Sequence, residues 1–394
     1  MVVVPALLRT LALVVLAARL TAAATPAEAA GAADLTAVEE VVGDAIRSGE
    51  IPGAIVLVGR GDEILLHRAW GWRQTTPRPE RMTTDTIFDI ASLTKPLGTT
   101  LAVMALVERG AVKLDAPVGR YLPEFKGRPD ITVQRLLTHS AGLPAIPPAS
   151  VVRGGFPRVT RQIAKVALDY RPGTATQYSD TGFIVLGELV RRVSGERLDQ
   201  YLARVFFRPL GMRDTMFNPP RSLRRRIAPT EFSDDGLLRG VVHDPRARLL
   251  KGVAGHAGMF STAADLARLC RMLVNDGALE GRRFLKAATV QALWERRPDG
   301  WGTRALGWDI ASPYARGMMP WFPAGAVGHT GFTGTSVWID PASRTYLIIL
   351  TNRVHPSGGG AAKIRELRTR VTAAVGAALF TGVSAPLAEG AAPD

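Results

Sequence analysis

Cysteine is almost absent from this chain: Cys270 is the only one among 394 residues. A single cysteine excludes an intrachain disulfide and any zinc site built from several cysteines. The fold must therefore depend on its hydrophobic core, for which 46% hydrophobic and 21% charged residues are ordinary globular proportions. Cys270 lies in the apolar run Ala264–Leu273, whose helical spacing predicts that the thiol packs as a small buried side chain.

Acidic residues are in the minority, 35 against 49 lysines and arginines, which leaves a net charge of +14 at pH 7. Such an excess suits either nucleic acid or an acidic cell-envelope surface. The arginines are spread along the chain, with one dense cluster at Arg221, Arg224, Arg225 and Arg226. Neither a basic stripe interleaved with aromatic residues nor a nucleic-acid motif is present. We therefore expect no nucleic-acid partner.

Long hydrophobic runs are also missing, since no stretch approaches eighteen uninterrupted apolar residues. Residues 1–30 nevertheless form a separate block, in which Arg9 is followed by the short apolar run Thr10–Ala18 and a series of alanines. This order predicts a signal peptide over residues 1–30, cleaved near Ala24 or Ala29. We expect a periplasmic or secreted protein that makes no stable membrane insertion after cleavage.

The hydrophobic pattern changes along the chain in a way that defines the expected fold. Strand-like segments near both ends predict two hairpins, Gly53–Gly59 with Glu63–Trp70 and Thr335–Ile339 with Thr345–Leu350. Helical spacing dominates between them and returns over Ala362–Phe380. This order indicates an α/β plus all-α fold, in which an antiparallel sheet built from both chain ends is flanked by helices and carries a helical insertion.

The expected domain organisation follows from these patterns. One domain spans residues 31–383, and its helical subdomain occupies about residues 95–274. The tail over residues 384–394 consists of small and polar residues, which predicts disorder.

Ser92 and Lys95 form the first pattern with chemical meaning. Ser92 precedes the helical run Leu97–Arg109, so it lies at or near a helix N-terminus, where developing negative charge is stabilised. Three residues are almost one helical turn, which places Lys95 on the same face as Ser92. A lysine held against a serine can relay its proton when burial or a neighbouring charge lowers the lysine pKa. A serine cap beside a solvated lysine would give the same spacing.

Two further patterns are weaker by themselves. The segment Tyr178-Ser179-Asp180 enters a helix after a Pro-Gly turn, where a tyrosine is either a packing residue or, beside a lysine, a base. The segment Gly328-His329-Thr330-Gly331 directly precedes a predicted strand, and its glycines would let an edge strand approach a ligand closely. A histidine in such a position is more often structural than catalytic.

Taken in order, the three patterns resemble the motifs of the serine beta-lactamase and penicillin-binding protein superfamily, and most closely its class C beta-lactamase-like branch. Three more stretches share the resemblance: Leu137–Pro144, Pro209–Thr215 and Gly255–Thr262. The resemblance covers about residues 35–380. It implies the beta-lactamase and transpeptidase fold and a serine hydrolase that needs neither a cofactor nor a metal.

The resemblance also implies a role for each residue. Ser92 would attack a carbonyl and become acylated, while Lys95 and Tyr178 would share the proton transfers, with Tyr178 serving the deacylating water. The backbone N–H groups of Ser92 and Phe332 would form the oxyanion hole. The substrate site would be lined by Asp180, His329, Thr330 and Gly331.

Two positions depart from the family pattern. His329 stands where beta-lactamases carry a lysine that helps to hold a substrate carboxylate, and a histidine is mostly neutral at pH 7. Asp180 stands where an asparagine is common, and a carboxylate cannot donate to a substrate carbonyl, although it can pair with Lys95. The His-Thr-Gly form resembles D-stereospecific peptidases, esterases and penicillin-binding-protein homologues, so efficient beta-lactam turnover is not expected.

The expected substrates are small amides or esters. D-amino-acid peptides, including peptidoglycan fragments, come first, as for a D-alanyl-D-alanine carboxypeptidase. A carboxylesterase or a beta-lactamase of the same family is the alternative among enzymes. A penicillin-binding or sensory protein with little turnover is the alternative outside them, and Asp180 is the feature that favours it.

His139 and His256 are expected to order loops by hydrogen bonding. His139 and His256 lie in two of the stretches that resemble the family. His243, Asp244 and His355 resemble segments of one penicillin-binding-protein-like subgroup, and they can meet His256 at the mouth of the cleft. No spacing enforces that proximity, so no metal site is predicted.

Overall fold

The computed structural model describes residues 33–234, 236–298, 302–310, 312–319, 321–358 and 360–380. The signal peptide predicted over residues 1–30 and the disordered tail predicted over residues 384–394 lie outside these ranges. The description that follows concerns the compact unit that begins at Asp34. Every helix among the described residues is too short or too polar to cross a bilayer.

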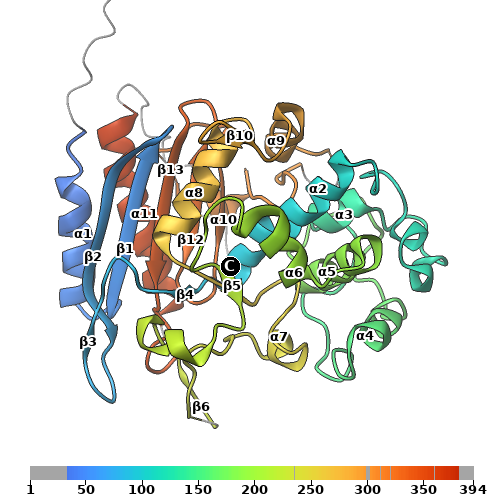
Figure 1. Ribbon diagram of the computed structural model, residues 1–394, viewed down its shortest axis with the longest axis horizontal. Helices are drawn as coiled ribbons and strands as arrows, with labels where there is room; N and C mark the ends of the chain where they lie inside the picture. The colour runs from blue at the N-terminus through green and yellow to red at the C-terminus, as the bar shows by residue number, and fades with distance from the viewer. Residues whose placement is uncertain are drawn as a thin grey trace, which may run out of the picture. The chain divides into compact units, whose positions relative to one another are not determined.

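A six-stranded antiparallel sheet is built from both ends of the chain, as predicted (Figure 1). Its strands, in spatial order, are β11 (Val327–Thr330), β12 (Ser336–Asp340), β13 (Thr345–Thr351), β1 (Gly53–Arg60), β2 (Glu63–Gln74) and β3 (Glu80–Arg81). The two chain ends meet where β1 pairs with β13, in a register that aligns Ala54 with Thr351. Both predicted hairpins are confirmed, although β2 continues to Gln74 rather than ending at Trp70.

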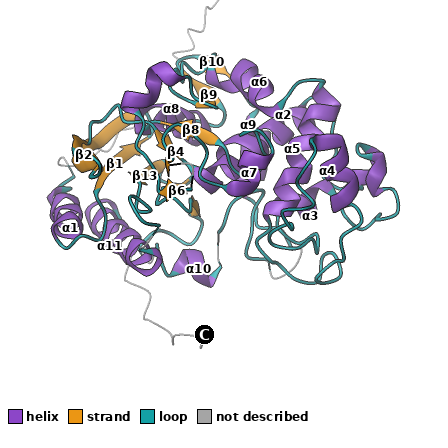
Figure 2. Ribbon diagram, turned by 90° about the horizontal axis from the view of Figure 1, so that it is seen from below, coloured by secondary structure: helices purple, strands orange, loops and turns teal. Residues whose placement is uncertain are grey.

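Helices cover both faces of this sheet (Figures 1 and 2). α1 (Thr36–Arg47) and α11 (Ala361–Leu379) contact each other on one face, and α8 (Ala263–Val274) packs on β1 and β13 across the other. Residues along a strand therefore alternate between two hydrophobic clusters: Val56 belongs to the cluster beneath α1 and α11, and Leu57 to the other. Burial on both faces explains why β1 and β13 are almost continuously apolar.

The helical subdomain ends earlier than the predicted boundary near residue 274. Its expected last helix, α8, lies on the sheet and not beside it. Cys270 is fully buried in α8, within the same hydrophobic cluster as Tyr346 of β13, which confirms its predicted packing role. Helical periodicity shows which face of a helix is buried, but it does not show whether a sheet or another helix covers that face.

The remaining helices lie mainly beside the sheet. They are α2 (Leu101–Glu108), α3 (Val133–Leu137), α4 (Phe156–Ile163), α5 (Asp180–Ser194), α6 (Leu198–Leu202), α7 (Pro245–Leu249), α9 (Ala287–Trp294) and α10 (Pro313–Arg316). Helix α5 contacts α2, α3, α4 and α6, so it is the centre of the helical subdomain. The hydrophobic core of this part is continuous with the cluster on the α8 side of the sheet.

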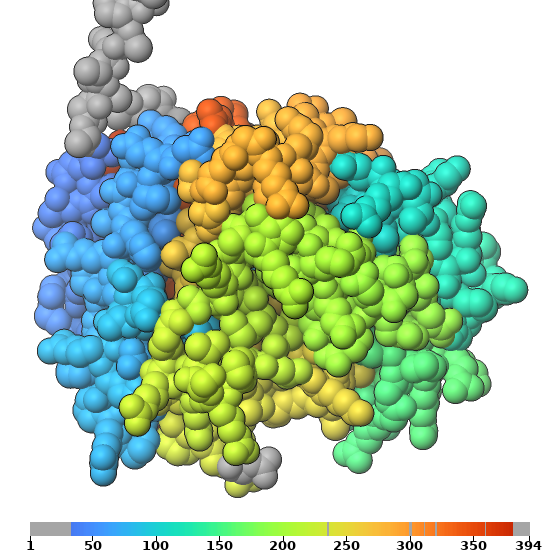
Figure 3. Space-filling model, viewed as in Figure 1, coloured from blue at the N-terminus to red at the C-terminus, as the bar shows by residue number. Residues whose placement is uncertain are grey.

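Short strand pairs connect the two parts. They are β4 (Phe88–Asp89) and β5 (Met216–Phe217) on either side of β8 (Met259–Ser261), β6 (Phe232–Ser233) with β7 (Gly236–Leu237), and β9 (Ala278–Leu279) with β10 (Arg282–Arg283). The chain between β5 and α7 (yellow-green) lies against the β1–β2 hairpin (blue) in the space-filling view (Figure 3). An ion pair of 2.6 Å between Arg239 and Glu80 joins the same chain to β3, the strand that follows this hairpin.

Candidate active site

Ser92 is presented by a short turn between β4 and the first helix of the helical subdomain. It lies in the 3₁₀ turn η1 (Ala91–Leu93), which continues into the π-helical turn η2 (Lys95–Thr100) and then into α2. Ala91 has a φ of 48°, a left-handed conformation that a non-glycine residue adopts only where its surroundings impose it. The buried Asp89 carboxylate accepts the Ala91 N–H at 2.9 Å and so holds this turn.

Lys95 is completely buried and contacts Ser92 as the helical spacing predicts. Its Nζ lies 3.0 Å from Ser92 Oγ, 3.0 Å from the carbonyl oxygen of His256 and 2.7 Å from Asp180 Oδ1. Burial alone would lower the pKa of Lys95, but the Asp180 carboxylate and Tyr178 outweigh burial and raise it. Lys95 is therefore a cation in the resting protein, and it can help Ser92 only by stabilising a negative charge beside it.

Tyr178 completes this group from the start of α5. Ser179 caps α5, because its Oγ accepts the Gly182 N–H at 3.1 Å, and its own N–H donates to His139 Nδ1 at 3.0 Å. Lys95 Nζ lies 4.6 Å from the centre of the Tyr178 ring. Burial raises the pKa of Tyr178, while the positive charge of Lys95 acts in the opposite direction. We call Ser92, Lys95, Tyr178 and Asp180 the serine cluster.

The third predicted segment ends beside Ser92 because a glycine allows it. A Cβ on Gly331 would lie 2.6 Å from the carbonyl oxygen of Ile90, closer than real side chains approach. The hydroxyls of Thr333 and Thr335 donate to the carbonyl oxygens of Asp89 and Ile90, at 2.8 and 3.1 Å. These bonds fix the end of β11 against the turn that carries Ser92.

Phe332 lies next to this glycine, at the position expected for the second oxyanion donor. Its backbone N–H makes no hydrogen bond within the part of the chain that the structure describes. The Phe332 ring is 59% exposed and lies between the His243 ring, 5.3 Å away, and the Arg353 guanidinium, 4.7 Å away. An apolar platform therefore borders the place where a substrate carbonyl would lie.

His329 is neutral, as its reference pKa suggested. It is buried at the end of β11, and burial, together with the positive charges of Lys95 and Arg304, lowers its pKa well below the usual value. Its Nδ1 lies 2.9 Å from the carbonyl oxygen of Thr330, and its ring centre is 5.9 Å from that of Tyr178. His329 therefore cannot supply the positive charge of the lysine that it replaces.

A cleft of about 460 Å³ brings the predicted residues together. Its walls include Ser92, Tyr178, His329, Thr330, Gly331 and Phe332. Lys95 and Asp180 lie behind Ser92 and do not line the cleft. Asp180 pairs with Lys95, so it is not among the residues that face a substrate, contrary to the prediction.

The cleft lining also contains two residues that the sequence did not reveal, Tyr314 and Arg368, beside the predicted Thr330. We call Tyr314, Thr330 and Arg368 the outer wall. The Tyr314 hydroxyl lies 3.2 Å from Thr330 Oγ1, and Arg368 Nη2 donates to the carbonyl oxygens of Gly331 and Thr335, at 3.0 and 2.8 Å. Burial lowers the pKa of Arg368 to about 10, so its guanidinium stays charged at neutral pH.

One signal for Arg368 is present in the sequence. The buried face of α11 includes Ile364, Leu367, Val371 and Val375, and Arg368 lies within that apolar stripe. A charged residue in such a stripe is a candidate for a buried polar role. Tyr314 gives no comparable signal, because its position depends on how the chain between α9 and β11 folds over the cleft.

His139 has the loop-ordering contact that we expected, because its Nδ1 accepts the Ser179 N–H at 3.0 Å. His139 is buried against Tyr178, and His355 bonds through both ring nitrogens to the N–H of Thr75 and the carbonyl oxygen of Thr230. His243 bonds to Glu231 and not to a histidine. The suggested meeting of His243 and His355 with His256 therefore does not occur.

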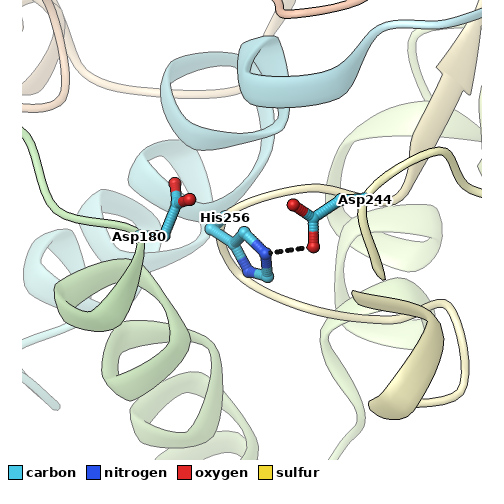
Figure 4. A group of neighbouring side chains, drawn as sticks. All are labelled: Asp180, Asp244 and His256. Carbon is cyan, nitrogen blue, oxygen red and sulfur yellow. Dashed lines mark hydrogen bonds and ion pairs between the residues drawn. The ribbon is translucent and has the colours of Figure 1, made fainter. Parts of the chain in front are cut away.

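Of the three residues suggested as neighbours of His256, Asp244 does meet it, as Figure 4 shows, with Nε2 2.9 Å from Asp244 Oδ1. Oxygen and nitrogen atoms of Asp180, Asp244 and His256 lie within 4.8 Å of one another, a spacing that could hold a metal ion. The Lys95 ammonium already lies 2.7 Å from Asp180, so a positive charge occupies this group without a metal.

This fold and the serine cluster define a class of protein. The chain belongs to the beta-lactamase family, whose family model matches residues 36–370, and it is a serine hydrolase of the superfamily that the motifs resemble. A Salmonella schwarzengrund (strain CVM19633) protein, provisionally named D-alanyl-D-alanine carboxypeptidase, is 32% identical over 345 residues, covering 77% of this chain and 79% of the relative.

Two solved structures illustrate the range of the class. A penicillin-binding protein homologue from Caulobacter crescentus is 25% identical with a TM-score of 0.71, covering 88% of this chain and 97% of its own. EstCE1, described as a hydrolase with promiscuous acyltransferase activity, is 24% identical with a TM-score of 0.69, covering 86% and 97%. The fold is therefore shared by proteins that carry different activities.

Proposed function

We propose that this protein is an exported hydrolase that cleaves small amides or esters through an acyl-enzyme on Ser92, with D-alanyl-D-alanine peptides as its substrates. The observation that carries the proposal is the 3.0 Å contact between Ser92 Oγ and Lys95 Nζ, with Tyr178 in the wall of the same cleft. Export is supported by the signal-peptide pattern of residues 1–30, which lie outside the described part of the chain.

Acylation begins with Ser92 and Tyr178. Tyr178 acts as the base in the small fraction of molecules in which it is a phenolate, a state that the adjacent Lys95 ammonium stabilises. Tyr178 takes the Ser92 proton as Ser92 Oγ attacks the substrate carbonyl. The same proton then passes from Tyr178 to the leaving amine or alcohol, and the carbonyl carbon remains bonded to Ser92.

Deacylation reverses these roles. Tyr178 takes a proton from water, the resulting hydroxide attacks the acyl carbon, and Ser92 leaves with the proton returned by Tyr178. In both steps the N–H groups of Ser92 and Phe332 stabilise the negative charge on the carbonyl oxygen. Loss of one such donor costs about 10²–10³ in rate in comparable sites.

The choice of a D-alanyl-D-alanine peptide depends on the outer wall. Such a peptide ends in a free carboxylate, and His329 is neutral. The Arg368 guanidinium is buried beside the cleft and forms no ion pair with any described carboxylate, while the Tyr314 and Thr330 hydroxyls lie next to it. Arginine with two hydroxyls suits a carboxylate well. The name of the Salmonella relative supports the same substrate class.

Two other functions have specific support. The exposed Phe332 ring and the likeness to EstCE1 favour a carboxylesterase. The Asp180 carboxylate favours a penicillin-binding or sensory protein, because its negative charge raises the pKa of Tyr178 and so disfavours the phenolate that deacylation needs. A beta-lactamase remains the fourth candidate, since the family includes class C enzymes.

One experiment distinguishes these functions. Purified protein and its Ser92→Ala variant are treated with a fluorophosphonate and, separately, with a penicillin, and adducts are detected by intact-mass spectrometry. Hydrolysis of an N-acylated D-alanyl-D-alanine peptide, its C-terminal amide and a p-nitrophenyl ester is followed in parallel. We expect an adduct that Ser92→Ala abolishes, and cleavage of the free-carboxylate peptide above its amide.

Each contrary outcome has a defined meaning. Ester cleavage without peptide cleavage would replace the peptidase by an esterase. A persistent penicillin adduct without turnover would support the binding protein. Folded protein that forms no adduct with either reagent would overturn the assignment of Ser92.

A further inference from the structure

The buried His256 and the partly buried Asp244 form a pair directly behind the serine cluster. Asp244 comes from the N-cap of α7, and His256 comes from the loop before β8 (Figure 4). The His256 side chain is 1% exposed, and its Nε2 lies 2.9 Å from Asp244 Oδ1. Its Nδ1 has no hydrogen-bond partner within the described ranges of the chain. The mechanism proposed above gives neither side chain a role.

His256 connects Asp244 to Lys95. The backbone carbonyl of His256 accepts a hydrogen bond from Lys95 Nζ at 3.0 Å, while its ring bonds to Asp244. One residue therefore touches the Lys95 ammonium with its main chain and a carboxylate with its side chain. A change at Asp244 can reach Lys95 over two contacts.

The loop that carries His256 has no room to move away from Lys95. The carbonyl oxygen of Gly255 accepts a hydrogen bond from Thr99 Oγ1 in η2 at 2.7 Å. A Cβ on Gly255 would lie 1.9 Å from the carbonyl oxygen of Phe183 in α5. The loop is thus confined between the turn that carries Lys95 and the helix that carries Asp180, so altered charges there are not relieved by loop movement.

The charges around Lys95 are asymmetric. Lys95 is flanked by two carboxylates, Asp180 and Asp244, whose oxygens lie within 4.8 Å of a His256 nitrogen. Burial alone would raise the pKa of Asp244. The hydrogen bond from His256 and the nearby positive charge, to which Lys95 contributes, outweigh burial and hold the pKa of Asp244 well below the usual range. Asp244 is therefore anionic at neutral pH.

We propose that Asp244 and His256 are positioning residues that set the pH at which Ser92 becomes reactive. His256 holds the Lys95 ammonium against Ser92, and the negative charge of Asp244 stabilises that ammonium. The inference depends on the proposed function only in that Ser92 must be acylated; it does not depend on the peptide substrate.

Other charged and titratable groups act on the same centre from the elements packed around it. They are Asp180 and Tyr178 at the start of α5, His139 after α3, His329 on β11, Arg304 before β11, and Asp89 on β4, which faces Asp244. All of them are unchanged in a variant of Asp244. A shift in pH dependence in that variant therefore originates in the lost charge of Asp244, which acts on Lys95 and also on Asp89.

The decisive variant is Asp244→Asn. Asparagine is also a good N-cap, and its oxygen can still accept from His256 Nε2, so the substitution removes the charge and keeps both contacts. Loss of a nearby negative charge lowers the pKa of Lys95 and of Tyr178 alike, so the sign does not depend on which group accepts the serine proton. We expect the acid limb of the labelling rate to move to lower pH by about half to one unit.

The measurement is the rate of fluorophosphonate labelling of Ser92 between pH 6 and 11, followed by intact mass, because the pKa values of Lys95 and Tyr178 both lie above their usual values. Glu231→Gln is the matched control. It also neutralises a carboxylate that bonds to a histidine, since Glu231 Oε1 lies 2.8 Å from His243 Nε2, but this pair lies outside the group around Lys95. We expect its profile to match that of the wild type. Thermal unfolding of each variant confirms that the protein is folded.

A second comparison tests His256. The amide of His256→Gln can donate to Asp244, whereas His256→Ala cannot. We expect labelling of the alanine variant to fall about ten- to hundredfold and the glutamine variant to recover part of that loss. An Asp244→Asn profile that falls by one factor at every pH, with an unchanged midpoint, would overturn the inference and make Asp244 a helix cap alone.

The outcomes also separate this inference from the proposed function. If Ser92 is labelled and the Asp244→Asn midpoint shifts while D-alanyl-D-alanine peptides are not cleaved, only the substrate assignment fails. If folded wild-type protein is not labelled at Ser92, both fail.

Discussion

Ser92 and Tyr178 of the serine cluster line the same cleft as the outer wall, but the two groups differ in charge balance. In the serine cluster, the buried Lys95 ammonium is paired with Asp180 at 2.7 Å. In the outer wall, Arg368 is equally buried, yet its described hydrogen bonds go to the carbonyl oxygens of Gly331 and Thr335. The positive charge of Lys95 is balanced without a ligand, whereas that of Arg368 is not balanced by any described carboxylate.

This difference has an energetic meaning. A buried charge without an opposite charge destabilises the empty protein, and the cost is recovered when an anion binds beside it. A paired ammonium needs no ligand and keeps its geometry for proton transfer in every substrate complex. The contrast suggests that the serine cluster provides the chemistry common to the family, while the outer wall selects the substrate. The predictions below test that division, from the largest expected effect to the smallest.

Replacing Lys95 with methionine should have the largest effect. The variant keeps most of the side-chain volume but removes the charge that stabilises the Tyr178 phenolate and leaves Asp180 buried without its partner. We expect the rate of p-nitrophenyl ester hydrolysis to fall by about 10²–10⁴. The control is Lys126→Met, at an exposed position. A loss of less than tenfold in folded protein would show that Lys95 is not part of the chemistry.

Arg368→Lys should affect substrate binding and leave the chemistry largely intact. Lysine keeps a positive charge but lacks the planar fork that binds a carboxylate through two hydrogen bonds. We expect KM for the free-carboxylate peptide to rise about ten- to hundredfold, with a smaller change for its C-terminal amide. Steady-state kinetics on both peptides measure the ratio, and Arg370→Lys, whose native arginine pairs with Glu50, is the control on the same helix. Equal changes in KM for the two peptides would show that the outer wall does not bind the substrate carboxylate.

His139→Asn should change the pH dependence of stability. Burial, with the positive charges of Arg304 and Lys95, lowers the pKa of His139 in the folded protein well below its usual value. The pKa in the unfolded chain is near 6.5, so between these two values only the unfolded chain binds the proton. Stability is therefore lost as the pH falls below about 6.5. Asparagine tolerates the φ of 59° at this position and can accept the Ser179 N–H in place of Nδ1.

The expected result is a shallower slope in the variant. The free energy of unfolding should lose about 1.4 kcal/mol less per pH unit than in the wild type below pH 6.5. Urea unfolding at several values between pH 5 and 7.5 measures the slope. Identical slopes in the two proteins would mean that His139 binds its proton equally in both states.

Asp180→Asn should have the smallest effect. Asp180 raises the pKa of both Lys95 and Tyr178, so its removal lowers both and moves the acid limb of activity to lower pH. We expect a change of a few-fold near neutral pH and faster release of a penicillin adduct. Intact-mass measurement of adduct decay checks the second point. A slower release would show that Asp180 promotes deacylation, contrary to the binding-protein argument.

The sequence predicted the serine cluster better than it predicted the outer wall, for a physical reason. Ser92 and Lys95 lie within one helical turn, so local geometry places both side chains on one face. Tyr178 and His329 are distant from Ser92 in sequence, so local geometry does not predict that they lie near it. That prediction came from the resemblance of their motifs to those of a known family. Tyr314 and Arg368 belong to separate elements, and only folding brings them together beside Thr330.

The same reasoning applies to the fold. Alternating and helical patterns gave the two terminal hairpins and the long helical region, because these depend on which faces of a segment are apolar. These patterns did not show that α8 lies on the sheet, or that Asp244 meets His256. Local periodicity shows which face of a segment is apolar and does not show what contacts that face. Asp180 was expected among substrate-facing residues and instead lies behind Ser92 against Lys95.

The sequence by itself determined the antiparallel sheet from two chain ends, the serine and lysine on one helical face, and the absence of disulfides. The tertiary structure decided the state of those groups. Lys95 is a cation because α5 brings Asp180 to it, and His329 is neutral because it is buried near Lys95 and Arg304. Charge state depends on burial and on neighbours that are distant in sequence, and these exist only once the chain has folded.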